Sequence, residues 1–97
     1  MLFRQALDAG DLRRVRAIAR EMPCVSLPDA LRICHLMHDE AAYERAAVRW
    51  VGRLALEGRS VDLHDLQAAA AALDALPQRP DTALATLTAI LARTDPR

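Results

Sequence analysis

Residues 40–58 read EAAYERAAVRWVGRLALEG, and their apolar side chains recur every three or four positions. This spacing places the apolar side chains on one face of an α-helix. The stripe is the best defined in the chain and consists of Tyr43, Ala47, Trp50, Val51 and Leu54. We expect the helix to end at about Leu56, because Gly58 follows and glycine is favoured just after a helix C-terminus. This long helix is predicted to lie at the centre of the fold.

Glycine and proline divide the remaining chain into further helical segments. The pattern predicts helices over residues 2–9, 12–22, 27–38 and 63–76, and a sixth that follows Pro80 and ends at about Arg93. Ser26 and Asp62 stand at N-cap positions of the third and fifth helices. Residues 27–56 fit either one continuous helix or two. We favour a break near Asp39, because Glu40 then lies at the positive end of a new helix.

No segment alternates apolar and polar residues with the β-branched enrichment of a strand. The sequence therefore predicts an all-α fold. A length of 97 residues fits one domain and leaves no room for two. We expect a single compact array of five to six short antiparallel helices over residues 1–97, with residues 94–97 as a frayed tail.

The charge balance limits the classes of partner. The chain has 13 basic and 13 acidic residues and a pI near 6.8. A non-specific nucleic-acid or anionic-membrane binder normally carries a strong positive field, which this chain lacks. All 13 basic residues are Arg and twenty residues are Ala. This composition is typical of a GC-rich bacterial genome, so the preference for Arg is not interpreted as selection for phosphate binding.

Two features predict a cytoplasmic protein. The chain has only two cysteines, Cys24 and Cys34, far fewer than a disulfide-rich secreted domain of this size. The N-terminus reaches a charge at Arg4 without an apolar segment, and the longest apolar run covers only residues 68–73. We therefore expect reduced thiols, no signal peptide and no membrane span.

Catalytic and metal sites are not predicted. Cys34 and His38 are four residues apart, so a helix would place both on one face, as metal ligands require. However, Cys34 also continues an apolar stripe, and its spacing from Cys24 matches no standard zinc module. We expect no metal, no cofactor and no catalytic residue. The pair His38-Asp39 resembles that of the HD metal-dependent phosphohydrolases, so a metal-dependent hydrolase is the third candidate function.

A basic ridge is the alternative candidate site. Its six arginines recur on the polar faces of the helices predicted over residues 12–22 and 40–56, and they are Arg13, Arg16, Arg20, Arg45, Arg49 and Arg53. Only Glu57 is placed to neutralise one of them, Arg53, within the same helix. Such a ridge fits nucleic acid or an acidic protein. The other interpretation is a solvated face whose ion-pair partners come from neighbouring helices.

The preferred candidate site is apolar. The first and last helices have wide apolar faces, formed by Leu2, Phe3, Leu84, Leu87, Ile90 and Leu91. These faces either meet another chain or close the two ends of the bundle. We expect a small non-enzymatic protein-interaction or regulatory adaptor that binds another protein or a second copy of itself as a homodimer. A nucleic-acid-associated regulatory factor is the alternative.

Overall fold

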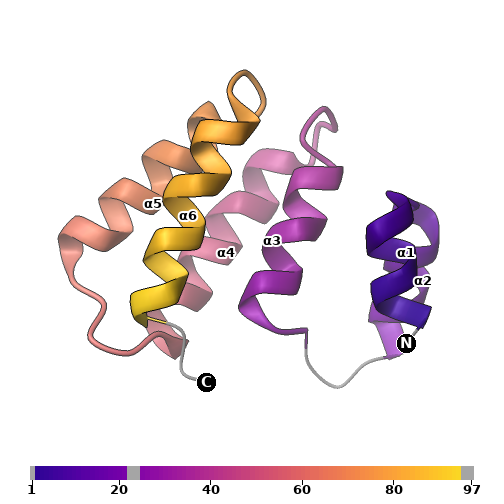
Figure 1. Cartoon of the computed structure of the whole chain (residues 1–97), viewed down its shortest axis with the longest axis horizontal. Helices are drawn as coiled ribbons and strands as arrows, with labels where there is room; N and C mark the ends of the chain where they lie inside the picture. Colours follow the sequence, from indigo (N-terminus) through magenta and orange to yellow (C-terminus); the bar gives the residue numbers. More distant parts are fainter. Residues whose placement is uncertain (1, 22–24, 95–97) are drawn as a thin grey trace.

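The computed structural model describes residues 2–21 and 25–94, which form six α-helices and no strand. The helices are α1 (Leu2–Ala9), α2 (Leu12–Glu21), α3 (Leu27–Leu36), α4 (Tyr43–Glu57), α5 (Leu63–Ala75) and α6 (Pro80–Thr94). The predicted all-α fold is confirmed (Figure 1). No helix in these ranges is long and apolar enough to cross a membrane.

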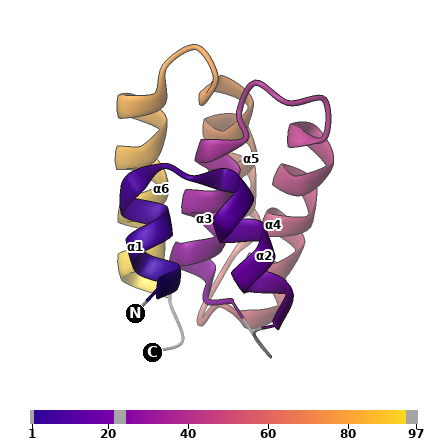
Figure 2. The same cartoon turned by 90° about the vertical axis from the view of Figure 1, so that its right-hand side faces the viewer.

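The helices form two parts that share α3. In the larger part, α4 packs between α3 and α5, and α6 packs against α5 and α3. The smaller part is a hairpin of α1 and α2 that lies against the other side of α3 (Figures 1 and 2). The long helix α4, predicted to be central, packs against α3 and α5, whereas α3 packs against α2, α4 and α6 and therefore has one neighbour more.

Each part has its own apolar core. The larger core is built around Trp50, Leu54, Leu73 and Leu87, which are at most 2% exposed. The smaller core joins the hairpin to α3, and its buried members are Phe3, Ala6, Leu7 and Val15. Half-buried Ile33 on α3 packs against both cores. The two cores therefore meet on α3.

Local capping signals set the helix boundaries. Ser26 Oγ accepts a hydrogen bond from the Asp29 N–H at 3.3 Å, which confirms the predicted cap of α3. Residues 37–42 form turns, so the predicted break between the third and fourth helices is confirmed. α4 begins at Tyr43, later than predicted, because the Tyr43 N–H closes a separate turn by donating to the Glu40 carbonyl at 3.0 Å. The predicted helix end at Met22 lies outside the described residues.

The start of α5 is a capping box. Asp62 Oδ1 accepts from the Asp65 N–H at 2.8 Å, and the Asp62 N–H donates to Asp65 Oδ2 at 3.3 Å. Asp65 also accepts a hydrogen bond from Arg93 of α6 at 2.7 Å. Asp65, for which no role was predicted, therefore links the first turn of α5 to the last turn of α6.

The C-terminal end of α6 is well packed. Thr94, which the sequence placed in a frayed tail, is 1% exposed, and its hydroxyl donates to the Ile90 carbonyl at 2.7 Å. The Thr94 carbonyl in turn accepts from the Arg59 N–H at 2.7 Å. The α4–α5 loop is thus tied to α6. Residues 95–97 of the predicted tail lie beyond the described part of the chain.

Leu54 and Leu56 of α4 form a matched test of the core. Leu54 is 0% exposed and Leu56 is 88% exposed. We expect Leu54→Ala to lower the free energy of unfolding by about 2–5 kcal/mol, because it leaves a cavity in the core. Leu56→Ala should change it by less than about 0.5 kcal/mol. Denaturant unfolding followed by circular dichroism measures both, and equal losses would contradict the placement of α4.

Asp65→Asn tests the capping box through its pH dependence. The hydrogen bond from Arg93, together with the one from the Asp62 backbone, lowers the pKa of the Asp65 carboxyl. A lowered folded-state pKa gives stability that is present above the ordinary pKa of aspartate and is lost as the pH falls through the folded value. Asp65→Asn should therefore lower Tm at pH 7, and the difference from the wild-type chain should shrink on acidification. Exposed Asp39→Asn is the control for removing one charge, and a difference that persists at pH 2 would rule out this account.

Candidate functional site

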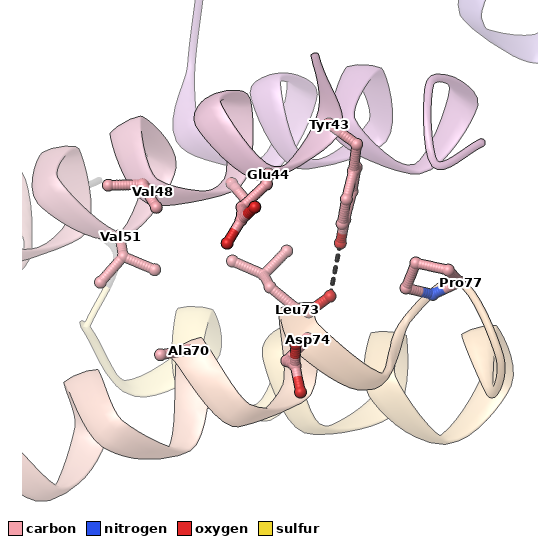
Figure 3. Close-up of a pocket in the computed structure, with 9 residues that line it drawn as sticks. Tyr43, Glu44, Val48, Val51, Ala70, Leu73, Asp74 and Pro77 are labelled. Atoms are coloured by element: carbon pink, nitrogen blue, oxygen red, sulfur yellow. Dashed lines mark hydrogen bonds between the residues drawn. The ribbon is translucent and has the colours of Figure 1, made fainter. Parts of the chain in front are cut away.

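An open groove lies between α4 and α5. Its volume is about 550 Å³, and it is lined by Tyr43, Glu44, Ala47, Val48, Val51, Ala70, Leu73, Asp74 and Pro77 (Figure 3). The lining includes small Ala47 on α4 and small Ala70 on α5. Most of the lining is apolar, so the groove is suited to an apolar group of a ligand or a partner.

The groove is apolar because α4 and α5 each have apolar residues outside the stripe that faces the core. Val48 is next to buried Ala47 in α4, and it is 66% exposed. In α5, Leu63 precedes Ala70 by seven residues, or nearly two full turns, so it lies on the same face of the helix. Leu63 is 70% exposed. The apolar face therefore extends along α5 beyond the groove itself.

A buried hydrogen bond connects α4 and α5 at the groove. The Tyr43 hydroxyl donates to the Leu73 carbonyl at 2.6 Å (Figure 3). Burial, with smaller contributions from Cys34 and Asp74, raises the pKa of Tyr43 to about 12. The phenol therefore stays protonated at neutral pH and acts as a fixed hydrogen-bond donor between α4 and α5.

Two carboxylates stand on opposite walls of the groove. Glu44 comes from the first turn of α4 and Asp74 from the last turn of α5 (Figure 3). Both residues are exposed, and no described residue forms an ion pair with either one. The lining contains no basic residue. The groove is therefore apolar along its floor and negative at its edges.

A larger cavity of about 670 Å³ lies between α3 and α6. Its charged edge residue, Arg32, pairs with Asp8 of α1 at 2.6 Å. His35 lies at the same edge and is half-buried. Because the charge at this cavity is already neutralised within the chain, it gives less indication of a partner than the α4–α5 groove does.

The structure brings together half of the predicted basic ridge. Arg16, Arg49 and Arg53 line one cavity of about 340 Å³ between α2, α3 and α4. Arg16 pairs with Glu40 at 2.8 Å, and Arg53 forms a bidentate pair with Glu57 at 2.7 and 3.1 Å.

The Glu57 pair was predicted, whereas the Glu40 pair joins residues far apart in sequence and was missed. The other ridge residues are exposed and lie outside this cavity, and they are Arg13, Arg20 and Arg45. The ridge is therefore divided, and two of its six arginines already form ion pairs with carboxylates of the same chain.

The apolar residues predicted to meet another chain lie mostly inside this one. Phe3, Leu87, Ile90 and Leu91 are at most 7% exposed, and Leu84 is half-buried. The side chain of Leu2 lies outside the described part. Closing the ends of the bundle accounts for the buried residues, and their contact with a partner stays a prediction. Among the described residues, the large apolar side chains that are exposed are instead Val48, Leu56 and Leu63, none of which was predicted. The available signal was that Val48 lies off the α4 core stripe.

Cys34 and His38 do not come together as metal ligands. Cys34 is 4% exposed, whereas His38 is exposed and its Nδ1 lies 2.9 Å from the His35 carbonyl. The described residues contain no group of three or more His, Cys, Asp or Glu side chains that could hold a metal ion. Cys24 lies outside those residues.

Comparison with known proteins gives no match: no family model, no curated protein sequence and no solved structure matches the chain. The indications of function are therefore the geometry of the grooves and their charges.

Thiol labelling tests the burial of Cys34. Burial raises the pKa of the Cys34 thiol to about 11, against a smaller opposite effect of Arg49. In a Cys24→Ser chain, Cys34 is the only thiol. We expect Cys34 to react with iodoacetamide at pH 8 at least about 100-fold more slowly in the folded chain than in guanidinium. In the folded chain the reagent has little access to the thiol, and only a small fraction of the thiol is deprotonated. Equal rates would contradict the burial of Cys34.

Proposed function

We propose that this chain is a small non-enzymatic protein-interaction module whose α4–α5 groove holds an apolar segment of another polypeptide. The observation that carries the proposal is the exposed side chain of Val48 over an apolar floor formed by Val51, Ala70 and Leu73. Exposed apolar surface rimmed by polar residues is a feature of protein-binding sites. The buried apolar faces of α1 and α6 need no such partner.

The shape of the groove favours a helical segment. Two adjacent helices leave a furrow along their length, and a third helix can lay an apolar face into it. Ala47 and Ala70 at the floor allow close approach. A partner chain and a second copy of this chain both provide such helices.

The polar groups of the groove favour a binding site over a catalytic site. The Tyr43 hydroxyl is already engaged with the Leu73 carbonyl, so it has no base beside it to make it a nucleophile. The nucleic-acid alternative remains a prediction, and the ion pairs of Arg16 and Arg53 weaken it. A free, buried Cys34 supports our further proposal of a reducing, cytoplasmic location. The Arg-rich and Ala-rich composition supports a bacterial origin.

A peptide-display selection against the wild-type chain, followed by affinity measurements at submicromolar protein, tests the proposed function. We expect amphipathic peptides to be enriched, and Val48→Gln to weaken their binding about tenfold, because a side chain at the centre of the contact is lost.

The matched control is Leu56→Gln. Leu56 is exposed on the same helix, but it lies about 140° around α4 from Val51 and does not line the groove. The selected peptides should bind Leu56→Gln with the same affinity as the wild-type chain. The proposal fails if no peptide is enriched, or if both variants weaken binding equally.

A further inference from the structure

The outer face of α4 has opposite charges on its two sides. Around the helix, Glu44 lies about 40° to one side of Val48, and Arg45 lies about 60° to the other side. Gly52 lies on the same side as Arg45. All four residues are exposed. The face therefore has an apolar centre, an acidic side next to the groove and a basic side away from it.

The acidic side is stronger than one carboxylate. Asp74 joins Glu44 at the groove and stands in the last turn of α5, where the helix dipole is negative. No basic residue in that turn offsets it. A carboxylate at this position is unfavourable for the isolated chain, so the site would be stabilised by a cation from outside.

The basic side likewise has no ion-pair partner among the residues that the structure describes. Arg45 forms no ion pair with any residue that the structure describes, although five other arginines do. Opposite charges only one residue apart in a helix point about 100° away from each other, so Glu44 and Arg45 cannot neutralise one another well. Both sides are therefore open to complementary charges.

We propose that the occupant of the α4–α5 groove is a second copy of this chain, which packs its α4 parallel to the first around a two-fold axis. The axis runs along the helices, so each residue lies level with its counterpart. The acidic side of each copy then faces the basic side of the other, and Arg45 of the second copy meets Glu44 and Asp74. This inference rests on the proposed function of the groove and names its partner.

Symmetry selects the parallel arrangement. With a two-fold axis across the helices, α4 would pack antiparallel and the acidic sides of both copies would share one edge of the interface. That arrangement leaves Arg45 of each copy away from the carboxylates. In the parallel arrangement, Glu44 and Arg45 are nearly level, because a helix rises only about 1.5 Å per residue.

Gly52 leaves open space on the outer face of α4. It is exposed in the middle of α4, where glycine is less favourable than alanine, and a Cβ atom built on it has nothing within 4 Å. Nothing inside the chain requires glycine here. Its absent side chain lets a second helix approach closely beside Val48.

Charge exchange between two variants tests the proposal. In Arg45→Glu both sides of the interface are acidic, and in Glu44→Arg the carboxylate of Glu44 is replaced by a base that faces Arg45. We expect each variant alone to dimerise at least tenfold more weakly than the wild-type chain. An equimolar mixture should form heterodimers, because at one contact Glu44 and Asp74 meet Arg45, and at the other contact the two introduced charges attract each other.

Sedimentation velocity at low salt measures the wild-type chain, each variant and the mixture. The chain concentration should cover about 10–500 µM, because an interface formed by α4 and one edge of α5 is small and its dimer is weak. Arg13→Glu, a charge change at an exposed site on α2, is the control and should dimerise like the wild-type chain. Circular dichroism checks that every variant is folded.

The dimer is refuted if the wild-type chain is monomeric throughout this range, or if the mixture dimerises no better than its components. The proposed function is separable from this outcome. If peptides still bind in a Val48-dependent way to a monomeric chain, the groove serves another protein. If they do not, both proposals fail.

Discussion

Two buried hydrogen bonds fix the rotation of α4, and the surfaces on either side of that helix depend on it. The Trp50 indole N–H donates to the Leu27 carbonyl at the start of α3 at 2.9 Å, and the Tyr43 hydroxyl donates to the Leu73 carbonyl in α5 at 2.6 Å. Both rings are buried, so either polar atom would be costly if it were left unpaired. α4 is therefore held between α3 and α5 in one orientation, with Val48 pointing outward.

The hairpin of α1 and α2 is held differently. Partly exposed ion pairs such as Arg16–Glu40 and Arg32–Asp8 connect it to the larger part of the fold, and pairs of this kind each contribute little to stability. Its attachment depends mainly on the small core around Phe3, which packs against α3. The hairpin therefore has fewer buried apolar residues to hold it than the larger part of the fold has. The α4–α5 groove lies on the other side of the molecule from that weaker attachment, as the separation of α2 and α5 shows (Figure 1).

Local signals in the sequence predicted most of the helices, but not their neighbours. The caps at Ser26 and Asp62 depend on residues only three positions apart, and both were found. Whether an apolar face is buried depends on which helix lies over it. Leu87 and Ile90 of α6 are covered by helices of the same chain, which periodicity alone does not show. The groove was missed for the same reason: it exists only because α4 and α5 are neighbours in space.

The net charge of zero excludes a long-range field, but a local field at contact distance can persist. Glu44 and Arg45 cancel in any count of charges along the chain. The helix nevertheless turns them to different sides of α4, and Asp74 from α5 adds to only one of those sides. A sequence count therefore hides a charge separation that the fold creates. Because Glu44 and Arg45 face away from each other on α4, they do not neutralise one another within the chain, and in the dimer that we propose the opposite sides of two copies meet.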